Sequence, residues 1–371
     1  MASKKPLVPN ANFTVPLANS ADYPKPLFLP LPSSPNKGFI KGRPTPSGVG
    51  KILTTTHARY ALALIAKAEL SPGDTVLLPA YHCPALVEPF IWSGCKISFY
   101  NMRYDLQPDE NDFATKLPIA QAAVLVRYFG FDANIKSLVH QARHAGCKVI
   151  EDLAHAAFID ELHGDYAVTS LRKFYPIDIG AEIYIKEGKD SSLIERKLNE
   201  YRKTAVLSAL KRLTLKLQNK IGKKLSLHFH ETPSYRYFND MELGRPLGNI
   251  YRKETGNDSS RKIIECRRRN FSTINKLLKK SKLGTPLFPE LENNTTPYVY
   301  PFLLRRKEYF DMIRSAGIPL FRWEELAPTE CKVSKEFRSK LIQVPCHQDL
   351  TESNLETIAN ALDSDTIIKN V

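Results

Sequence analysis

Hydrophobic and polar positions between residues 51 and 185 alternate in short runs of two kinds. Apolar runs of about five residues, typical of buried strands, occupy 75–79, 96–100, 122–128, 147–151, 166–171 and 181–185. Between most of them, apolar residues recur at helical spacing over 57–69, 84–93, 108–115 and 134–145. This alternation predicts an α/β domain with a large, mostly parallel sheet and helices on both of its faces.

The rest of the chain follows other patterns. Apolar stripes predict a long helix over 189–225 and a second helix over 259–278. Short runs then predict strands at 298–304, 319–323 and 342–345 and helices at 307–316 and 351–362, a small α+β domain. Prolines in the first fifty residues exclude a regular helix or a central strand there.

We therefore expect three parts in this chain. Residues 1–50 form an N-terminal arm that lies over the body of the protein or its dimer partner, with a disordered tail as the alternative for the first ten or so. Residues 51–250 form the large domain, with a basic helical extension at about 190–225. Residues 251–371 form a helical connector and the small C-terminal domain.

The formal net charge of the chain is +14, which favours anionic binding partners. Ten Lys or Arg and one acid lie between Arg196 and Lys224, so this helix presents either a contact for an acidic membrane surface or a solvated face. The triplet Arg267-Arg268-Arg269 comes without a recognised nucleic-acid module, and we expect no nucleic-acid partner.

Metal binding and secretion are not expected either. The six cysteines are scattered singly, and His228 and His230 lack the further ligands that a zinc site needs. No apolar run approaches the ~20 residues of a membrane span, and the first ten residues contain no apolar signal core. We expect a cytoplasmic protein that keeps its cysteines as thiols.

Candidate chemistry lies at two strand ends. Asp152 follows the strand at 147–151, and Lys173 follows the strand at 166–171. A lysine amine can form a Schiff base with an aldehyde cofactor. A carboxylate can keep the pyridine nitrogen of pyridoxal phosphate (PLP) protonated. No GxGxxG follows any strand, so nicotinamide binding is unsupported.

Two further segments suit such a cofactor. A helix that starts near residue 57, with Thr55 or Thr56 as its cap, directs backbone N–H groups at a phosphate. Tyr81 and His82 end the strand at 75–79, where ligands bind in an open α/β sheet. Either side chain can stack on the pyridine ring, and packing of Tyr81 into the core is the alternative.

Four motifs together resemble the DegT/DnrJ/EryC1/StrS family of sugar aminotransferases. They are SPGDTVLLPAYHCPA (71–85), EDLAHA (151–156), SLRK (170–173) and PCHQDL (345–350). The resemblance covers roughly residues 48–185 and, more loosely, about the last seventy. It implies the PLP-dependent transferase fold of type I and a homodimer, in which a segment after the lysine reaches the neighbouring subunit's cofactor.

The resemblance also implies roles for single residues. Lys173 is the Schiff-base lysine and proton shuttle, and Asp152 pairs with the pyridine nitrogen. His155 lies near the ring hydroxyl, and Ser170 reaches the phosphate. The phosphate segment contains Ala58 and Arg59, with Ala58 where the family usually has glycine. Residues 178–181 also depart from the family, which tends to show a Gly-Gly pair there.

The function implied is transfer of an amino group from glutamate to a nucleotide-linked keto sugar, in surface polysaccharide or deoxyaminosugar biosynthesis. Arg322 then either clamps a substrate phosphate or the donor's carboxylate, or braces the domain interface. Two alternatives stay open. A related sugar dehydratase has histidine at the position of Lys173, which argues against it. A non-catalytic scaffold is favoured by Ala58 and the missing glycine pair.

Overall fold

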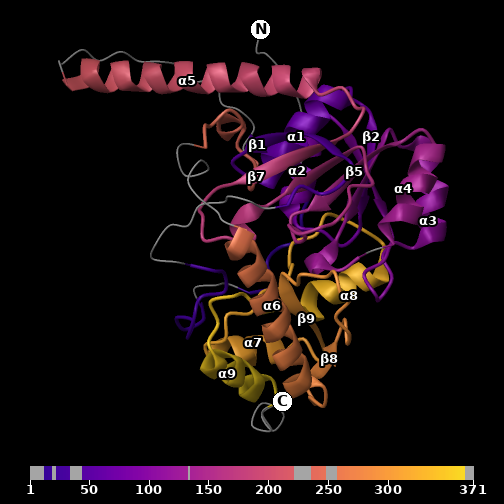
Figure 1. The fold of residues 1–371 in the computed structure, drawn as a ribbon, viewed down its shortest axis with the longest axis vertical. Helices are drawn as coiled ribbons and strands as arrows, with labels where there is room; N and C mark the ends of the chain where they lie inside the picture. The colour runs from indigo at the N-terminus through magenta and orange to yellow at the C-terminus, as the bar shows by residue number, and fades with distance from the viewer. Residues whose placement is uncertain are drawn as a thin grey trace.

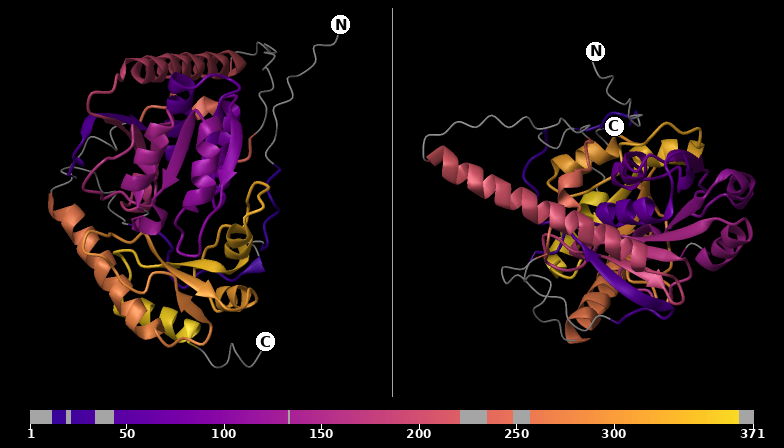
Figure 2. Two further views of the ribbon diagram at one scale, coloured as in Figure 1. Left: turned by 90° about the vertical axis from the view of Figure 1, so that its right-hand side faces the viewer. Right: turned by 90° about the horizontal axis from the view of Figure 1, so that it is seen from above.

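The computed structural model describes residues 12–18, 22–33, 44–132, 134–220, 235–247 and 257–363. Figure 1 shows the large domain above the small one, with helix α5 (Ser192–Lys220) projecting beyond the body. The sheet of the large domain, seen from its side in Figure 2, stands between the α5 helix and the small domain. The junction between the two domains therefore lies at one end of this sheet.

The large sheet has seven strands in the order β1-β7-β6-β5-β4-β2-β3. Pairing is parallel from β3 through β2, β4 and β5 to β6, and β7 is antiparallel to both β6 and β1. The strands are β1 (Val49–Thr55), β2 (Thr75–Pro79), β3 (Lys96–Tyr100), β4 (Ala122–Val126), β5 (Lys148–Leu153), β6 (Tyr166–Thr169) and β7 (Ala181–Lys186). Strand β4 is buried along its whole length, as both faces of a central strand are covered.

Helices connect these strands as the hydrophobic pattern predicted. They are α1 (Ala58–Glu69), α2 (Pro84–Trp92), α3 (Glu110–Lys116) and α4 (Ile135–His144), with the 3-10 turns η2 (Leu117–Ile119), η3 (Tyr128–Gly130), η4 (Leu171–Lys173) and η5 (Asp240–Glu242). Helix α1 packs on α2, β6 and β7, whereas α4 packs on α3 and β5. Strand β1 was not predicted, because as a half-exposed edge strand it lacks a continuous apolar run.

The small domain combines α6 (Asn257–Leu278) with a three-stranded antiparallel sheet. The sheet order is β10-β9-β8, from β8 (Gly284–Pro286), β9 (Val299–Leu304) and β10 (Leu341–Pro345), and the other helices are α7 (Tyr309–Ser315), α8 (Lys332–Lys340) and α9 (Glu352–Leu362). The strand predicted at 319–323 is wrong, since only an isolated bridge from Phe321 to Gln343 forms there. Pro319 contributes no N–H to a ladder.

The arm packs on the small domain, as far as its residues are described. Thr14 N donates to Leu326 O at 2.8 Å, and Leu27 N donates to Gly317 O at 2.9 Å. The expectation that the arm lies over the body is confirmed for these residues. The tail expected for the first ten residues lies outside the described part of the chain, as do His228 and His230.

A close contact fixes the two domains against each other. Gly130 has φ of 97° and lies so near Thr296 O that a Cβ atom would overlap this carbonyl. Beside it, Tyr298 N donates to Phe129 O at 2.8 Å. The segment before β9 is thereby held against the turn that follows β4, at the carboxyl ends of the parallel strands.

Candidate active site

Lys173 ends the η4 turn that follows β6, and it keeps some solvent-accessible surface. Surrounding protein atoms nevertheless lower the pKa of Lys173 to about 8, mainly because burial disfavours the ammonium form. The charges of Cys83 and Asp152 oppose this shift. The Nζ atom lies 5.4 Å from the centre of the Tyr298 ring. An amine with this pKa is partly neutral near physiological pH, as a nucleophile must be.

The side chains of Glu151 and Asp152 point to opposite faces of the sheet, because successive residues of a strand alternate in direction. Burial raises the pKa of Asp152, while the N–H of Ala154 (2.8 Å) and the charge of Lys173 lower it. Glu151 is fully buried and binds the Arg127 guanidinium at 2.9 Å, away from the lysine. The structure thus brings Lys173 and Asp152 together, as the sequence predicted.

His155 stands in an aromatic stack beside the lysine. Its ring lies 4.5 Å from Tyr298 and 5.4 Å from Phe129, both nearly parallel to it, and 5.3 Å from Trp323. Burial, and secondarily the charge of Lys173, holds the pKa of His155 well below its usual range. Its buried Nδ1 atom has no hydrogen-bond partner among the described residues. A neutral imidazole with an unused polar atom is suited to a ligand's hydroxyl.

Unused polar groups also gather at the start of α1. The N-cap residue of α1 is His57, and its side chain makes no capping hydrogen bond. The buried atoms Thr56 Oγ1 and His57 Nδ1 have no hydrogen-bond partner within the described part of the chain. Burial, together with the charges of Arg59 and Arg172, lowers the pKa of His57 to about 4. Uncapped N–H groups and nearby cations favour an anion.

The segments around this helix start are tied together. Gly180 N donates to Thr56 O, and Leu171 N donates to Gly180 O, so the loop that lacks the family's glycine pair still joins the lysine turn to α1. Ala58 is the first residue of α1. Ser170, 5% exposed, precedes the η4 turn and accepts a hydrogen bond from Lys173 N through its carbonyl. These groups fit the phosphate of PLP, with the lysine and Asp152 beyond them.

The residue expected to face the cofactor ring from β2 was Tyr81 or His82. Tyr81 is fully buried and packs 5.0 Å from Trp323, so the structure favours its core interpretation. His82 stacks on Phe99 at 4.8 Å, and its Nε2 accepts a hydrogen bond from Ala327 N. Neither ring is among the groups whose charges act on Lys173.

Cys83, the next residue, lies near the lysine. It is the N-cap of α2, and the charges of Lys173 and Asp152 both act on its thiol, whose pKa is raised by burial. Sequence reasoning found the end of β2 but not which side chain turns toward the lysine. The turn after Pro79 decides this orientation, and no pattern in the chain signals it.

Arg322 lines the cavity described below, and its guanidinium is held by partners within the small domain. Its Nε donates to Glu324 at 2.7 Å, its Nη1 donates to Ser339 O, and its guanidinium lies 3.7 Å from the Phe310 ring centre. Its side chain is 4% exposed. Its contacts thus lie within the small domain and not across the domain interface, and the role as a clamp for substrate stays a prediction.

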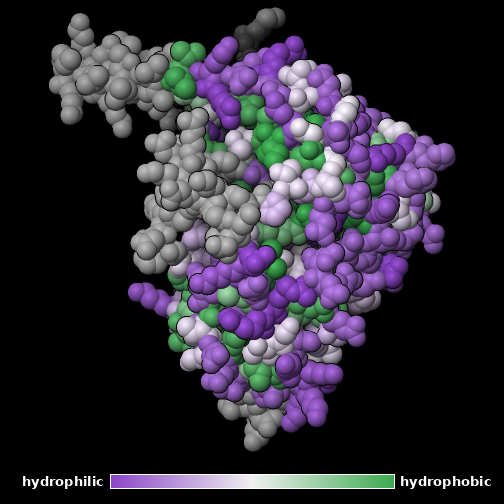
Figure 3. Space-filling view, in the orientation of Figure 1, coloured by the Kyte–Doolittle hydropathy of each residue, from purple (hydrophilic) through white to green (hydrophobic). Residues whose placement is uncertain are grey.

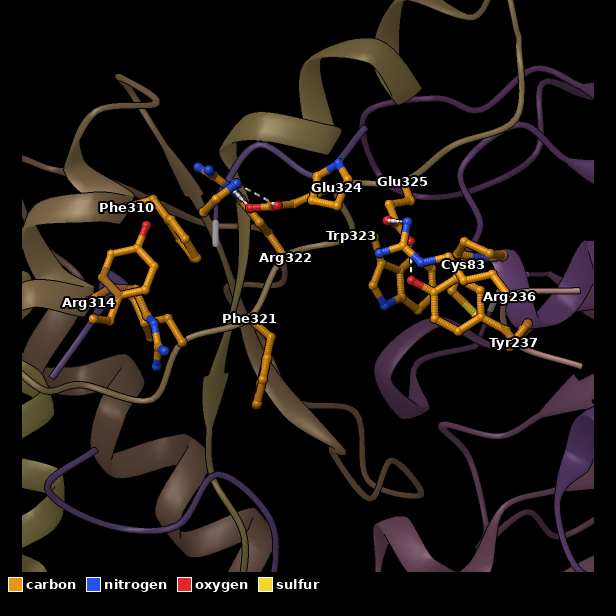
Figure 4. A pocket seen from close by; sticks show the side chains of 16 residues that line it. Cys83, Arg236, Tyr237, Phe310, Arg314, Phe321, Arg322, Trp323, Glu324 and Glu325 are labelled. Atoms are coloured by element: carbon orange, nitrogen blue, oxygen red, sulfur yellow. Dashed lines mark hydrogen bonds and ion pairs between the residues drawn. The ribbon is translucent and has the colours of Figure 1, made fainter. Parts of the chain in front are cut away.

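A cavity of about 390 Å³ extends from Cys83 along the small domain (Figure 4). Its walls carry cations and flat rings, among them Arg236, Tyr237, Arg314, Phe321 and Trp323. Arg236 pairs with Glu325 at 2.5 Å, and the Tyr237 hydroxyl donates to the same carboxylate. Residues 236 and 237 also donate through their backbone N–H groups to Glu88.

This observation bears on the segment expected to reach a neighbouring subunit. Its described part, residues 235–247, binds within its own chain, at Glu88 of α2 and Glu325 of the small domain. Arg59 likewise donates to Tyr237 O. The segment therefore closes the cavity from the side of the large domain.

The described surface shows few other site candidates. No described helix is apolar over a length that would span a bilayer. No three His, Cys, Asp or Glu residues of the described part are grouped so as to hold a metal ion. On the face drawn in Figure 3, hydrophilic side chains dominate and apolar ones form small separate patches.

Comparison with known proteins agrees with this geometry. Residues 47–177 match the model of the DegT/DnrJ/EryC1/StrS aminotransferase family. Over this part of its length the chain is similar to the family. No curated protein matches the sequence. The family is one of PLP-dependent sugar aminotransferases, and the matched span contains Cys83, Asp152 and Lys173.

Solved structures of family members share the fold across most of their length. The chain is similar to Helicobacter pylori PseC, an aminotransferase in pseudoaminic acid biosynthesis, with 18% identity, TM-score 0.64 and 87% and 88% of the two chains covered. A putative sugar aminotransferase of Streptococcus pneumoniae, Spr1654, has 16% identity, TM-score 0.65 and coverage of 87% and 88%. The type I PLP-transferase fold predicted from the sequence is confirmed.

Proposed function

We propose that this chain binds PLP at Lys173 and moves an amino group from glutamate to a nucleotide-linked keto sugar. One observation carries the proposal: the amine whose pKa is lowered to about 8 lies beside a buried carboxylate and near a helix start with unused anion-binding groups. When bound, PLP supplies an electron sink for breaking bonds next to an amine.

The residues of the chain divide the remaining work. Thr56, His57 and the first N–H groups of α1 hold the phosphate, with Arg59 and Arg172 supplying positive charge. Asp152 holds a proton at the pyridine nitrogen, and His155 contacts the ring hydroxyl through its free Nδ1. Cys83, whose thiol interacts with the charges of Lys173 and Asp152, would contact the ring in place of Tyr81 or His82.

Lys173 moves the proton in each half of the exchange. Its amine is neutral often enough to accept a proton, and its ammonium form is acidic enough to return it, since its pKa is near the working pH. The Tyr298 ring, 5.4 Å from Nζ, limits where this amine can swing. Burial of the surrounding groups excludes water that would compete for the proton.

The cavity beyond Cys83 supports the substrate class. Arg314 offers positive charge for a diphosphate, while Phe321, 47% exposed, and Tyr237 offer flat surfaces for a base. The similar protein PseC is an aminotransferase involved in the biosynthesis of pseudoaminic acid. We propose that the protein is a cytoplasmic homodimer and that glutamate is its amino donor.

Purified protein, reconstituted with PLP, tests the proposal. Wild type is expected to be yellow, and Lys173→Ala to lose the colour, whereas Lys136→Ala, an exposed lysine on α4, keeps it. Incubation with glutamate and a panel of nucleotide keto sugars should release 2-oxoglutarate with one of them. A protein that takes up no PLP would instead support the non-catalytic scaffold.

We also propose a peripheral contact of α5 with an acidic membrane surface. The helix projects from the body (Figure 1), and Val206 and Leu207 are 52% and 58% exposed on it. Four cations and two acids lie on its first sixteen residues. Flotation with phosphatidylserine vesicles should decline steeply with salt; equal recovery with neutral vesicles would contradict the contact.

A further inference from the structure

Arg267, on α6 of the small domain, is a fully buried cation whose side-chain hydrogen bonds go to uncharged oxygens. Its Nη1 donates to Tyr298 O at 2.8 Å and to Pro297 O at 3.2 Å, and its Nε donates to Gln348 Oε1 at 3.0 Å. Its Nη2 donates to Lys173 O at 2.9 Å. One side chain thus joins three segments of the small domain to the peptide of the lysine.

Gln348 makes a similar hydrogen bond to the next residue of the chain, Phe174. Its Nε2 donates to Phe174 O at 2.7 Å, and the Arg267 guanidinium lies 4.7 Å from the centre of the Phe174 ring. The carbonyls of Lys173 and Phe174 are therefore both held from the small domain. The backbone of the η4 turn depends on these bonds for its orientation, because a helix end leaves such carbonyls without internal partners.

The same guanidinium also places the ring that faces the amine. Tyr298 accepts a hydrogen bond from Arg267 through its carbonyl, while its ring lies 5.4 Å from Lys173 Nζ and 4.5 Å from the His155 ring. A shift of Arg267 would consequently displace the lysine and its aromatic neighbour together.

Packing alone does not account for an arginine here. Burying a guanidinium costs stability unless its donors are satisfied, and apolar residues of similar volume often replace buried charges without loss. A fork of rigid donors, by contrast, can fix several carbonyls at once. Arg267 therefore holds several carbonyl oxygens in place, which a methionine side chain, without N–H donors, could not do.

We propose that Arg267 is a positioning residue, which holds the Lys173 amine between Asp152 and Cys83 and makes its position depend on the placement of the small domain. The catalytic part of this inference rests on the proposed function, because it requires that Lys173 bind PLP. Its structural part, the hold on the η4 turn, does not require the cofactor.

Hydrogen exchange of the cofactor-free protein tests the structural part. In Arg267→Met, peptides that cover residues 171–177 should exchange at least tenfold faster, while strand β4 exchanges as in wild type. Arg268→Met is the matched control, since this neighbour on α6 donates instead to Glu292 O at 2.8 Å and to Thr295 O. Unchanged exchange of 171–177 in Arg267→Met would overturn the proposal.

Spectroscopy and kinetics test the catalytic part. With PLP bound, Arg267→Met should move the pH midpoint of the cofactor's absorbance change by half a unit or more. It should lower kcat roughly 10- to 100-fold with KM within about threefold. Arg267→Lys should restore part of kcat, because one donor remains. A loss of stability with wild-type midpoint and kcat would reduce Arg267 to a structural residue.

A second variant covers the case in which Arg267→Met does not fold. Gln348→Leu removes the bond to Phe174 O and one partner of Arg267, and should raise exchange over 171–177 by a smaller factor. If wild type binds no PLP, the proposed function fails while the exchange result still decides the positioning. If wild type is active and exchange is unchanged in both variants, the positioning alone fails.

Discussion

The lowered pKa of Lys173 gives a prediction about reactivity that needs no substrate. With a pKa of about 8, about a quarter of Lys173 amines are neutral at pH 7.5, whereas about 0.1% are neutral for a lysine of ordinary pKa. A less basic amine is also a weaker nucleophile, which reduces the advantage from more than a hundredfold to about tenfold. Lys173 should still react faster than the other lysines.

Trace acetylation of the cofactor-free protein measures this difference. The protein is exposed to limiting acetic anhydride between pH 6 and 11, and the label on each lysine is quantified by mass spectrometry. Labelling of Lys173 should reach half of its maximum near pH 8. The other lysines, labelled in the same sample, give the reference.

Replacement of a neighbour tests the cause of the shift. The Asp152 carboxylate raises the pKa of Lys173, so Asp152→Asn should move the labelling midpoint below that of wild type. Asp132→Asn, an exposed acid near the start of α4, should leave it unchanged. A wild-type midpoint near 10.5, or a higher midpoint in Asp152→Asn, would refute the reasoning.

Four other substitutions have expected outcomes. Thr56→Val should weaken PLP binding roughly fivefold in a fluorescence titration, because it removes one donor to the phosphate; unchanged affinity would place the phosphate elsewhere. Arg322→Met should lower the free energy of unfolding by about 3 kcal/mol in urea, since it leaves Glu324 unpaired, while KM stays within about twofold; a tenfold rise in KM would support the clamp interpretation. Glu151→Gln should cost about 3 kcal/mol by leaving the buried Arg127 without its anion; a loss below about 0.5 kcal/mol would show that the pair is dispensable. Gly130→Ala should lower Tm and loosen the domains, because φ of 97° and the nearby Thr296 O exclude a methyl group; a wild-type Tm would contradict this contact.

The large domain was predictable because its signals are local. The central parallel strands are buried on both faces, so their residues form continuous apolar runs, and each helix shows its own period. The signals were weaker in the small domain, where the expected strand at 319–323 became a bridge and β8, of three residues, went unseen. Edge strands such as β1 are half exposed and carry little pattern.

Part of the site could be predicted for the same reason. Asp152 lies near the carboxyl end of β5 and Lys173 follows the neighbouring parallel strand β6, so strand order alone brings them near each other. The expected cap by Thr55 or Thr56 was wrong, since His57 is the N-cap of α1 and no side chain caps the helix, but the Thr56 hydroxyl lies unused at the helix start. Cys83 was missed in favour of Tyr81 and His82, since a turn of a few residues decides which side chain faces the lysine.

The sequence by itself determined the order of strands and helices in the large domain, the place of the acid and the lysine, and the resemblance to the aminotransferase family, because these depend on neighbouring residues and on motif order. Only the tertiary structure decided that Arg322 binds Glu324 and that Arg267 holds the lysine peptide. Arg267 lies in a run of three arginines, and Arg322 is followed by Trp323 and two glutamates, but neither setting names the partner. Arg322 binds a residue 2 positions away, and Arg267 binds one 94 positions away. Burial of each guanidinium determines which groups its charge can reach, and no local sequence pattern shows that burial.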